Sequence, residues 1–359
     1  MKVAMVAHTD APWTADFARA LLGFGHTVRI FSFCPDEIDG LDVHFVGRLP
    51  YRPLQDKRPF VLHAPKLARL LRHFQPDVVL ATYLISNGLA ACLSWFGPLV
   101  VSAVGSDILR PKGTMQVPSL ARKLIIGGIT RRATLLHAVS DALADALVAY
   151  GVAPDRIRTF PTGVDVRRFA LAPAPTAALP HVVCTRRHAP VYDNAVIVEA
   201  LALLKRRGVP FTATFLCGGV LLEERRAHIA RLGLEGQVNC TGFSPDEQVP
   251  LEVARADVYV SASRSDGTSA SLLEAMAVGP LPVLSDITAN RPWVDDGRTG
   301  LLFPVGDEVA LADALQRALT DTALRTHARA HNRELVAARA DQITCMEALD
   351  AMLHEAVAR

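Results

Sequence analysis

The stretch VYVSASRSDGTSASLLEAMAVG, residues 258–279, passes from an apolar run through a polar turn into a helical pattern. Residues 258–261 predict a buried strand, and residues 269–278 predict a helix that ends at Gly279. Another apolar run follows at 283–284. The segment therefore predicts a β-α-β unit, which joins two parallel strands through a helix.

The same alternation extends over the whole chain. Continuous runs of Val, Ile and Leu separated by helices indicate parallel sheets that are covered on both faces. The predicted strands are 3–7, 28–33, 77–81, 99–104, 135–138, 182–184, 212–216, 238–241, 258–261 and 283–284, and the main predicted helices are 14–24, 65–74, 141–150, 195–207, 223–232, 248–254 and 269–278. We expect an α/β fold of two Rossmann-like, doubly wound domains.

A stretch without periodicity, rich in proline and alanine, occupies 171–180 and divides the two series of strands. We therefore expect an N-terminal domain at 1–164, a linker at 165–180 and a C-terminal domain at 181–342. A last amphipathic helix, about 343–359, is expected to pack back on the first domain. Parallel sheets bind ligands at the carboxyl ends of their strands, so we expect a cleft between the domains.

Composition excludes several classes of protein. Hydrophobic residues make up 50% and charged residues 21%, which excludes a disordered or fibrous chain. The net charge of +2 gives no field for nucleic acid. Residues 1–170 hold 20 Lys and Arg against 13 Asp and Glu, whereas residues 171–359 hold 18 against 23. The basic first half suits a domain that meets an anionic partner.

Neither the cysteines nor the apolar runs indicate export or a membrane span. The six cysteines lack C-x-x-C spacing, so neither a zinc site nor a disulfide framework is expected. The first apolar run meets His8 and Asp10 at once, which is too soon for a signal peptide. Every apolar run falls short of the ~18 residues that span a bilayer. We expect a cytoplasmic protein.

The turn before the predicted helix 269–278 has the residues of an anion site. Its hydroxyls can cap the helix, and free N–H groups at a helix start bind phosphate. Asp266 lies in the turn and Glu274 eight residues later. Carboxylates at those places can bind sugar or ribose hydroxyls. A capped helix with one solvated acid explains the pattern equally well, and both interpretations stay open.

Two adjacent arginines, Arg186 and Arg187, follow the predicted strand 182–184. A guanidinium at the carboxyl end of a strand can clamp a diphosphate. A solvated pair of charges is the alternative, and only one of the two needs to face inward. Gly218 and Gly219, which follow another strand, are a weak signal for a phosphate loop because no G-x-G-x-x-G is present.

The first half offers fewer candidates. Asp107 follows the strand 99–104 and either orients a substrate hydroxyl or caps the next segment. His8, Thr9 and Asp10 form the first strand-to-helix turn, although a lone histidine is more often structural. Ser140 is expected to be the N-cap of the helix 141–150.

Several sequence motifs of other enzyme classes are absent. The sequence has no G-x-x-x-x-G-K-[ST], H-E-x-x-H or G-x-S-x-G. It also lacks Asp-x-Asp, so no divalent-metal site of that kind is expected.

Nearly the whole chain resembles the family-four retaining glycosyltransferases of the GT-B fold, also called glycosyl transferases group 1. The run 265–277 is similar to that family's motif of two acids with seven residues between them, with Asp in the place of the usual first Glu. The other similar segments are Arg186 with 193–202, then 151–157, 161–169, 289–294 and 296–304.

The resemblance implies roles for individual residues. Glu274 would bind the donor's ribose, Asp266 the sugar hydroxyls, and Arg186 the leaving diphosphate. The backbone around Gly267, Thr268, Ser269 and Ala270 would hold the sugar or diphosphate, and that around Gly242 and Phe243 the base. Retention of configuration and independence of metal or other cofactors are also implied.

Two departures from the family pattern matter. Tyr192 stands where many relatives have a diphosphate-binding Lys, which shifts the charge to Arg186 with help from Arg187 or Arg264. Val104 stands where many have a sugar-contacting His, so Asp107 becomes the acceptor-side candidate.

The expected activity is transfer of a hexose from a UDP- or GDP-linked donor to a hydroxyl of an acceptor sugar, a lipid-linked glycan or a small molecule. A sugar-nucleotide epimerase of the same fold is the alternative, followed by a non-enzymatic sugar-binding protein. Peripheral membrane contact is open, because a basic group lies beside the apolar residues 124–126, but an ordinary helix with solvated charges fits as well. The basic group is Arg122, Lys123, Arg131 and Arg132.

Overall fold

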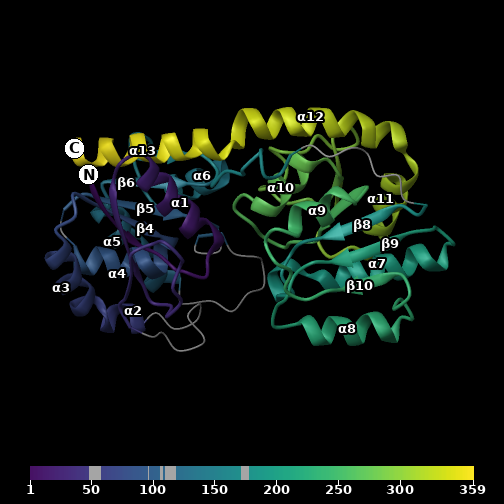
Figure 1. Cartoon of the computed structure of the whole chain (residues 1–359), viewed down its shortest axis with the longest axis horizontal. Helices are drawn as coiled ribbons and strands as arrows, with labels where there is room; N and C mark the ends of the chain where they lie inside the picture. Colours follow the sequence, from purple (N-terminus) through teal and green to yellow (C-terminus); the bar gives the residue numbers. More distant parts are fainter. Residues whose placement is uncertain (48–57, 96, 106–107, 110–118, 171–177) are drawn as a thin grey trace. The chain divides into compact units, whose positions relative to one another are not determined.

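The computed structural model describes residues 1–47, 58–95, 97–105, 108–109, 119–170 and 178–359. The chain divides into two compact units (Figure 1). Unit 1 comprises Met1–Thr162 together with Ile343–Arg359, and unit 2 comprises Gly163–Gln342. Each unit is built around its own parallel sheet.

The described part of unit 1 forms a seven-stranded sheet in the order β3-β2-β1-β4-β5-β6-β7, with parallel pairing throughout. Its strands are β1 (Lys2–Val6), β2 (Thr27–Ser32), β3 (Val43–Phe45), β4 (Val78–Thr82), β5 (Leu99–Ala103), β6 (Leu135–Ala138) and β7 (Ile157–Thr159). Its helical segments are α1 (Pro12–Gly23), α2 (Arg58–Leu62), α3 (Ala64–Phe74), the π-helix η1 (Tyr83–Gly88), α4 (Leu89–Ser94), α5 (Ser119–Arg132), α6 (Asp141–Ala149), η2 (Pro154–Arg156) and α13 (Gln342–Ala358).

Helices cover both faces of this sheet because alternate side chains of each strand point to opposite faces. On one face, Val3 and Met5 of β1 pack with α1 and with Met346, Leu349 and Leu353 of α13. Helices α2 to α5 cover the opposite face. The C-terminal helix α13 therefore completes the core of unit 1, although it is the last element of the chain (Figure 1).

The described part of unit 2 forms a six-stranded parallel sheet in the order β10-β9-β8-β11-β12-β13. Its strands are β8 (His181–Cys184), β9 (Thr212–Phe215), β10 (Val238–Cys240), β11 (Val258–Ser261), β12 (Leu281–Ser285) and β13 (Leu301–Phe303). Its helices are η3 (Pro190–Tyr192), α7 (Asn194–Arg206), α8 (Leu222–Arg231), α9 (Val249–Ala254), α10 (Ala270–Val278), α11 (Glu308–Thr320) and α12 (Thr322–Ala340).

The two faces of the second sheet have separate cores. Ile197 and Leu201 of α7 pack with Leu311 and Leu315 of α11 on one face. Met276 of α10 and residues of α9 and α12 cover the other face. Both sheets thus confirm the predicted pair of doubly wound α/β domains, including the β-α-β unit around 258–279.

Each strand order reverses beside its first strand, and this reversal determines where ligands can bind. The chain moves from β1 to β2 on one side and later to β4 on the other, and β8, β9 and β11 repeat that pattern. Doubly wound sheets bind ligands at this switch point, outside the carboxyl ends of the strands. In unit 1 that edge carries the turn 8–10, and in unit 2 it carries Arg186 and Asp266.

Three local findings bear on the sequence-based expectations. Residues 163–170 and 178–180 lie in unit 2, where Val164 and Phe169 are buried. Ser140 occupies the N-cap of α6, as predicted, although its side chain makes no capping hydrogen bond. Among the described residues, no helix combines the length and apolar character needed to cross a membrane.

Candidate functional site

Arg186 is the centre of a polar cluster at the carboxyl end of β8. Its side chain is only 8% exposed. Its Nη1 donates to Ser269 Oγ at 2.6 Å and to Ser271 Oγ at 2.8 Å, and its Nη2 donates to Asp266 Oδ2 at 2.5 Å. One guanidinium therefore joins the loop after β8 to the loop after β11 and the start of α10.

The start of α10 is shaped by its own hydroxyls. Ser269 is the N-cap, and its Oγ accepts from the backbone N–H of Leu272 at 3.2 Å. The Tyr259 hydroxyl, from the buried strand β11, donates to Ser271 Oγ at 3.1 Å. The expected hydroxyl cap is confirmed, and it leaves the helix with the partial positive charge that favours an anion near its first turn.

Electrostatics keep this cluster charged. Burial is the largest single influence and disfavours the charged form of Arg186, but Asp266 acting together with Tyr192, Tyr259 and Cys184 raises the pKa of Arg186 above its ordinary value. The Asp266 carboxylate also accepts from the N–H of Gly267 at 3.0 Å. Burial raises the pKa of the Tyr259 hydroxyl to about 12, so it stays a neutral donor. The site therefore contains a buried cation that can bind an anion in addition to Asp266.

The loop that carries Arg186 is fastened by residues that the sequence did not single out. Asn194 Nδ2, at the start of α7, donates to the carbonyl oxygen of Arg186 at 3.1 Å and lies 3.1 Å from His188 Nδ1. Burial, together with Arg225 and Arg226, lowers the pKa of His188 to about 4. A neutral His188 and a buried Asn194 therefore hold the loop in place.

The glycine pair after β9, Gly218 and Gly219, lets two loops pack closely against each other. The φ of Gly219 is +147°, and a Cβ atom there would approach the backbone of His188 to 2.5–2.8 Å. The carbonyl oxygen of Gly218 accepts from the N–H of His188 at 2.9 Å. The pair brings the β9 loop against the Arg186 loop, which a G-x-G-x-x-G search cannot detect.

Glu274 lies in the second turn of α10 and is half-buried. Its negative charge acts on the thiol of Cys217, which lies just after β9. Burial raises the pKa of Cys217, Arg187 and Arg186 lower it, and Glu274 raises it further. Glu274 therefore lies within electrostatic reach of the carboxyl edge of β9, on the side where the Arg186 loop lies.

The other predicted donor-site residues are spread along the same edge. Arg187 is exposed, so Arg186 is the member of the pair that faces inward. Arg264 Nη2 pairs with Asp193 Oδ2 at 2.5 Å, so its charge is already neutralised. Gly242, with φ +82°, precedes Phe243, which is 81% exposed. The described Gly267, Thr268 and Ala270 flank the cap of α10.

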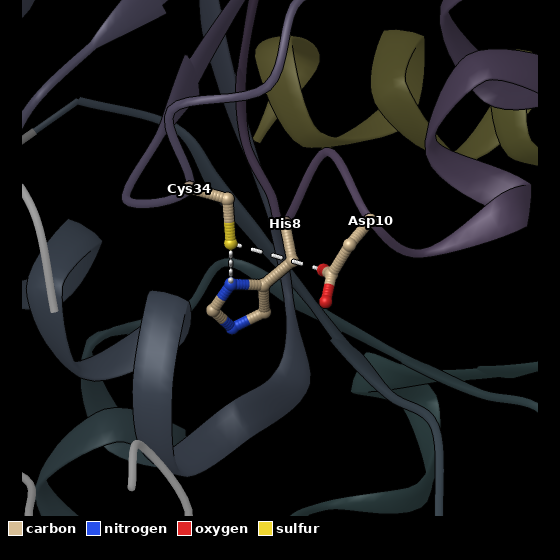
Figure 2. A group of neighbouring side chains, drawn as sticks. All are labelled: His8, Asp10 and Cys34. Atoms are coloured by element: carbon tan, nitrogen blue, oxygen red, sulfur yellow. Dashed lines mark hydrogen bonds between the residues drawn. The ribbon is translucent and has the colours of Figure 1, made fainter. Parts of the chain in front are cut away.

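In unit 1, the turn after β1 brings a second set of side chains together. His8, Asp10 and Cys34 point toward one another (Figure 2). Cys34 Sγ lies 3.6 Å from His8 Nδ1 and 3.8 Å from Asp10 Oδ1. Thr9 Oγ1 instead lies 3.3 Å from Ser32 Oγ. The sequence predicted the turn but missed Cys34, which lies two residues beyond the end of the neighbouring strand β2.

Two predicted features of unit 1 have different outcomes. Asp107 lies outside the described residues. In the basic group, Arg122 donates to the carbonyl oxygen of Ile108 at 2.8 Å and Arg132 to that of Trp95 at 2.7 Å.

Within the described residues, groups that could hold a metal ion are His8–Asp10–Cys34 and His26–Asp350–His354.

The chain matches known protein families in both halves. Residues 179–335 match the family model of glycosyl transferases group 1, and residues 13–168 match that of glycosyltransferase family 4. Among curated relatives, the GDP-mannose-dependent alpha-(1-6)-phosphatidylinositol monomannoside mannosyltransferase of Mycolicibacterium smegmatis is 33% identical over 45% of this chain and 46% of its own. The amylovoran biosynthesis glycosyltransferase AmsK of Erwinia amylovora is 30% identical over 51% of this chain and 47% of its own.

The matched segment thus spans about half the length of these curated relatives. Among solved structures, Anabaena HepE in complex with UDP-glucose superposes with a TM-score of 0.80 at 20% identity, covering 99% of this chain and all of that one. That likeness concerns the fold. The two family models cover most of the described chain, and the chain belongs to the glycosyl transferases group 1, of the GT-B fold.

Proposed function

We propose that the chain is a retaining glycosyltransferase that moves a hexose from a UDP- or GDP-linked donor to an acceptor hydroxyl without a metal ion. The observation that carries this proposal is the convergence of the buried Arg186 guanidinium with the start of α10. Breaking a sugar–diphosphate bond leaves negative charge on the departing nucleotide. A fixed guanidinium and a helix N-terminus stabilise such charge, as a metal ion does in other enzymes.

The acids complete the proposed donor site. Asp266, held by Arg186 and Gly267, would accept hydrogen bonds from sugar hydroxyls with its carboxylate oxygens. Glu274 would bind the ribose from the second turn of α10. The backbone beside Gly242 and Phe243 would contact the base, since the positive φ of Gly242 turns the chain at the carboxyl end of β10.

The names of the relatives support a nucleotide-sugar donor but leave the choice of nucleotide open. The mycobacterial relative is described as GDP-mannose-dependent, and the Anabaena structures contain UDP or UDP-glucose. AmsK serves biosynthesis of a polysaccharide, amylovoran. By analogy, we propose an acceptor sugar, free or lipid-linked. None of these relatives favours the epimerase alternative.

Contact with a membrane surface is part of the proposal for a lipid-linked acceptor only. Helix α5 exposes Leu120 and Leu124 by 68% and 63%, next to the exposed Lys123. Such a mixture of apolar and basic side chains suits anionic lipid. Co-sedimentation with vesicles of anionic phospholipid tests it, and failure of a Leu124→Asp variant to weaken binding would exclude α5 as the contact.

A thermal-shift screen against UDP, GDP, ADP and their common sugar conjugates tests the donor. A ligand at 100 times its dissociation constant stabilises the native state by about 2.7 kcal/mol, which such a screen detects. We expect a shift with one nucleotide family, unchanged by a chelator and lost in Glu274→Ala. A shift that depends on added Mg²⁺ would contradict the metal-independent mechanism.

A further inference from the structure

His8, Asp10 and Cys34 offer three different metal-ligand atoms at one edge of unit 1 (Figure 2). They are an imidazole nitrogen, a carboxylate oxygen and a thiol sulfur, all within 4.8 Å of one another. A mixed set with sulfur and imidazole is typical of zinc and similar borderline-soft cations, whereas magnesium and calcium prefer oxygen alone.

The spacing of these atoms fits a tetrahedral ion. Zinc binds sulfur at about 2.3 Å and nitrogen or oxygen at about 2.0–2.2 Å, so neighbouring ligand atoms of a tetrahedron lie roughly 3.5 Å apart. Here Cys34 Sγ lies 3.6 Å from His8 Nδ1 and 3.8 Å from Asp10 Oδ1. The two distances from the sulfur are therefore close to those of a tetrahedral ion, and all three ligand atoms lie within 4.8 Å of one another.

We propose that His8, Asp10 and Cys34 bind Zn²⁺ at the switch point of the unit 1 sheet, with a fourth coordination position left for water or a substrate oxygen. Three protein ligands and one exchangeable position are typical of zinc sites that act on substrates, whereas structural sites have four protein ligands. The proposal does not depend on the donor chemistry around Arg186, for which we propose no metal.

The surrounding fold holds the ligands in place without the ion. β1 and β2 pair in parallel, so the residues that follow them meet at one edge. Ser32 Oγ accepts from the N–H of Cys34 at 3.0 Å, and Thr14 Oγ1 donates to the carbonyl oxygen of His8 at 2.7 Å. The His8 ring also packs 5.7 Å from the Tyr83 ring, centroid to centroid. Preorganised ligands of this kind favour tight and specific binding.

The second group that could hold a metal ion is His26–Asp350–His354, and two of its ligand atoms lie too close together. His26 Nε2 lies 2.5 Å from Asp350 Oδ1, which is a hydrogen bond and too short for two ligands of one ion. That contact joins His26, the residue just before β2, to Asp350 of α13 within unit 1. We therefore assign His26, Asp350 and His354 a structural role and use His354 as a control.

The test is zinc titration of the full-length chain, stripped with a chelator and dialysed, in competition with a chromophoric zinc indicator. We expect one zinc ion per chain, bound at least about tenfold more weakly by Cys34→Ser and by Asp10→Asn. Cys92→Ser, which removes another half-buried thiol of unit 1, and His354→Ala are expected to bind as the parent chain does. Bound cobalt should give a thiolate-to-metal charge-transfer band. Cys34→Ser should abolish that band, and Cys92→Ser should keep it.

Three results would overturn the proposal. The parent chain binds no zinc at micromolar concentration, or Cys34→Ser binds it unchanged, or His354→Ala causes the larger loss. Thermal midpoints of the metal-free variants separate lost ligands from lost folding. If Cys34→Ser does not fold, the exposed Asp10 supplies the decisive variant, because Asp10→Asn changes no buried side chain.

Discussion

The guanidinium of Arg186 lies over the ring of Tyr192, with its Cζ atom 4.1 Å from the ring centroid. An aromatic face attracts a cation and limits its motion without adding another charge. The family resemblance implies a lysine at the place of Tyr192 in many members; in this chain the ring at that place supports the buried Arg186 cation. The contact predicts a supporting role for the ring and none for the hydroxyl.

Replacement of Tyr192 by alanine should lower kcat/KM for transfer. Cation–π contacts contribute about 0.5–2 kcal/mol, so the expected loss is roughly 2- to 30-fold. Tyr192→Phe keeps the aromatic face and should stay within about twofold of the parent. Steady-state kinetics with the donor identified by thermal shift measure both variants. Equal losses in the two would show that the hydroxyl, and not the ring, is the important group.

The two adjacent arginines provide a matched pair of variants. Arg186 is buried and bonded to Ser269, Ser271 and Asp266, whereas Arg187 is exposed. Loss of a group that stabilises charge developing in the transition state typically lowers kcat by about 10²–10³-fold. Arg186→Ala should show a loss of that size and a smaller change in donor affinity. Arg187→Ala should lower kcat less than tenfold, and unchanged turnover in Arg186→Ala would disprove the assigned role.

Much of this site was predictable because it depends on short-range sequence patterns. The apolar runs of β8 and β11 placed Arg186 and Asp266 at the ends of neighbouring parallel strands, and the serine before α10 predicted the cap. Among the edge strands, β10 was predicted, but β3, β7 and β13 were not. Each of these three has only three residues, which gives a weak pattern in the sequence.

The contacts that were missed join residues from different elements. Cys34 meets His8 because β1 and β2 pair in register, which spacing along the chain does not reveal. His188 looked like a loop residue, and its burial depends on the close approach of Gly219. Spacing along the chain does not distinguish Arg186 from Arg187, and only the family resemblance favoured Arg186, since the direction of each side chain is set by the loop conformation that Asn194 holds.

That close approach gives a prediction about stability. Gly219→Ala would place a methyl group within 2.5–2.8 Å of the His188 backbone, at a φ of +147°. We expect a loss of roughly 1–3 kcal/mol in the free energy of unfolding, measured with urea. Gly236→Ala is the matched control, because a Cβ atom there meets nothing within 4 Å. Similar midpoints for the two variants would mean that the loops do not pack closely.

Unit 1 contains a buried histidine that should make stability depend on pH. His137, on β6, has Nδ1 2.7 Å from Ser102 Oγ and Nε2 2.8 Å from the carbonyl oxygen of Phe160. Since a carbonyl only accepts, Nε2 carries the proton and Nδ1 accepts from the serine. Burial lowers the pKa of His137 to about 4, although its hydrogen bond to Phe160 opposes that shift.

The direction of the pH effect follows from where the proton binds. An unfolded chain protonates this histidine near its ordinary pKa of about 6.5, whereas the folded unit resists protonation down to about 4. Acid therefore favours the unfolded state across that interval, and His137 should remove about 2 kcal/mol of stability between pH 8 and pH 5. Urea titrations of the parent and of His137→Gln, whose amide can still donate to Phe160, isolate this contribution. The stability of the variant should fall by about that much less, and identical pH profiles would mean that His137 binds its proton equally well in the folded and the unfolded chain.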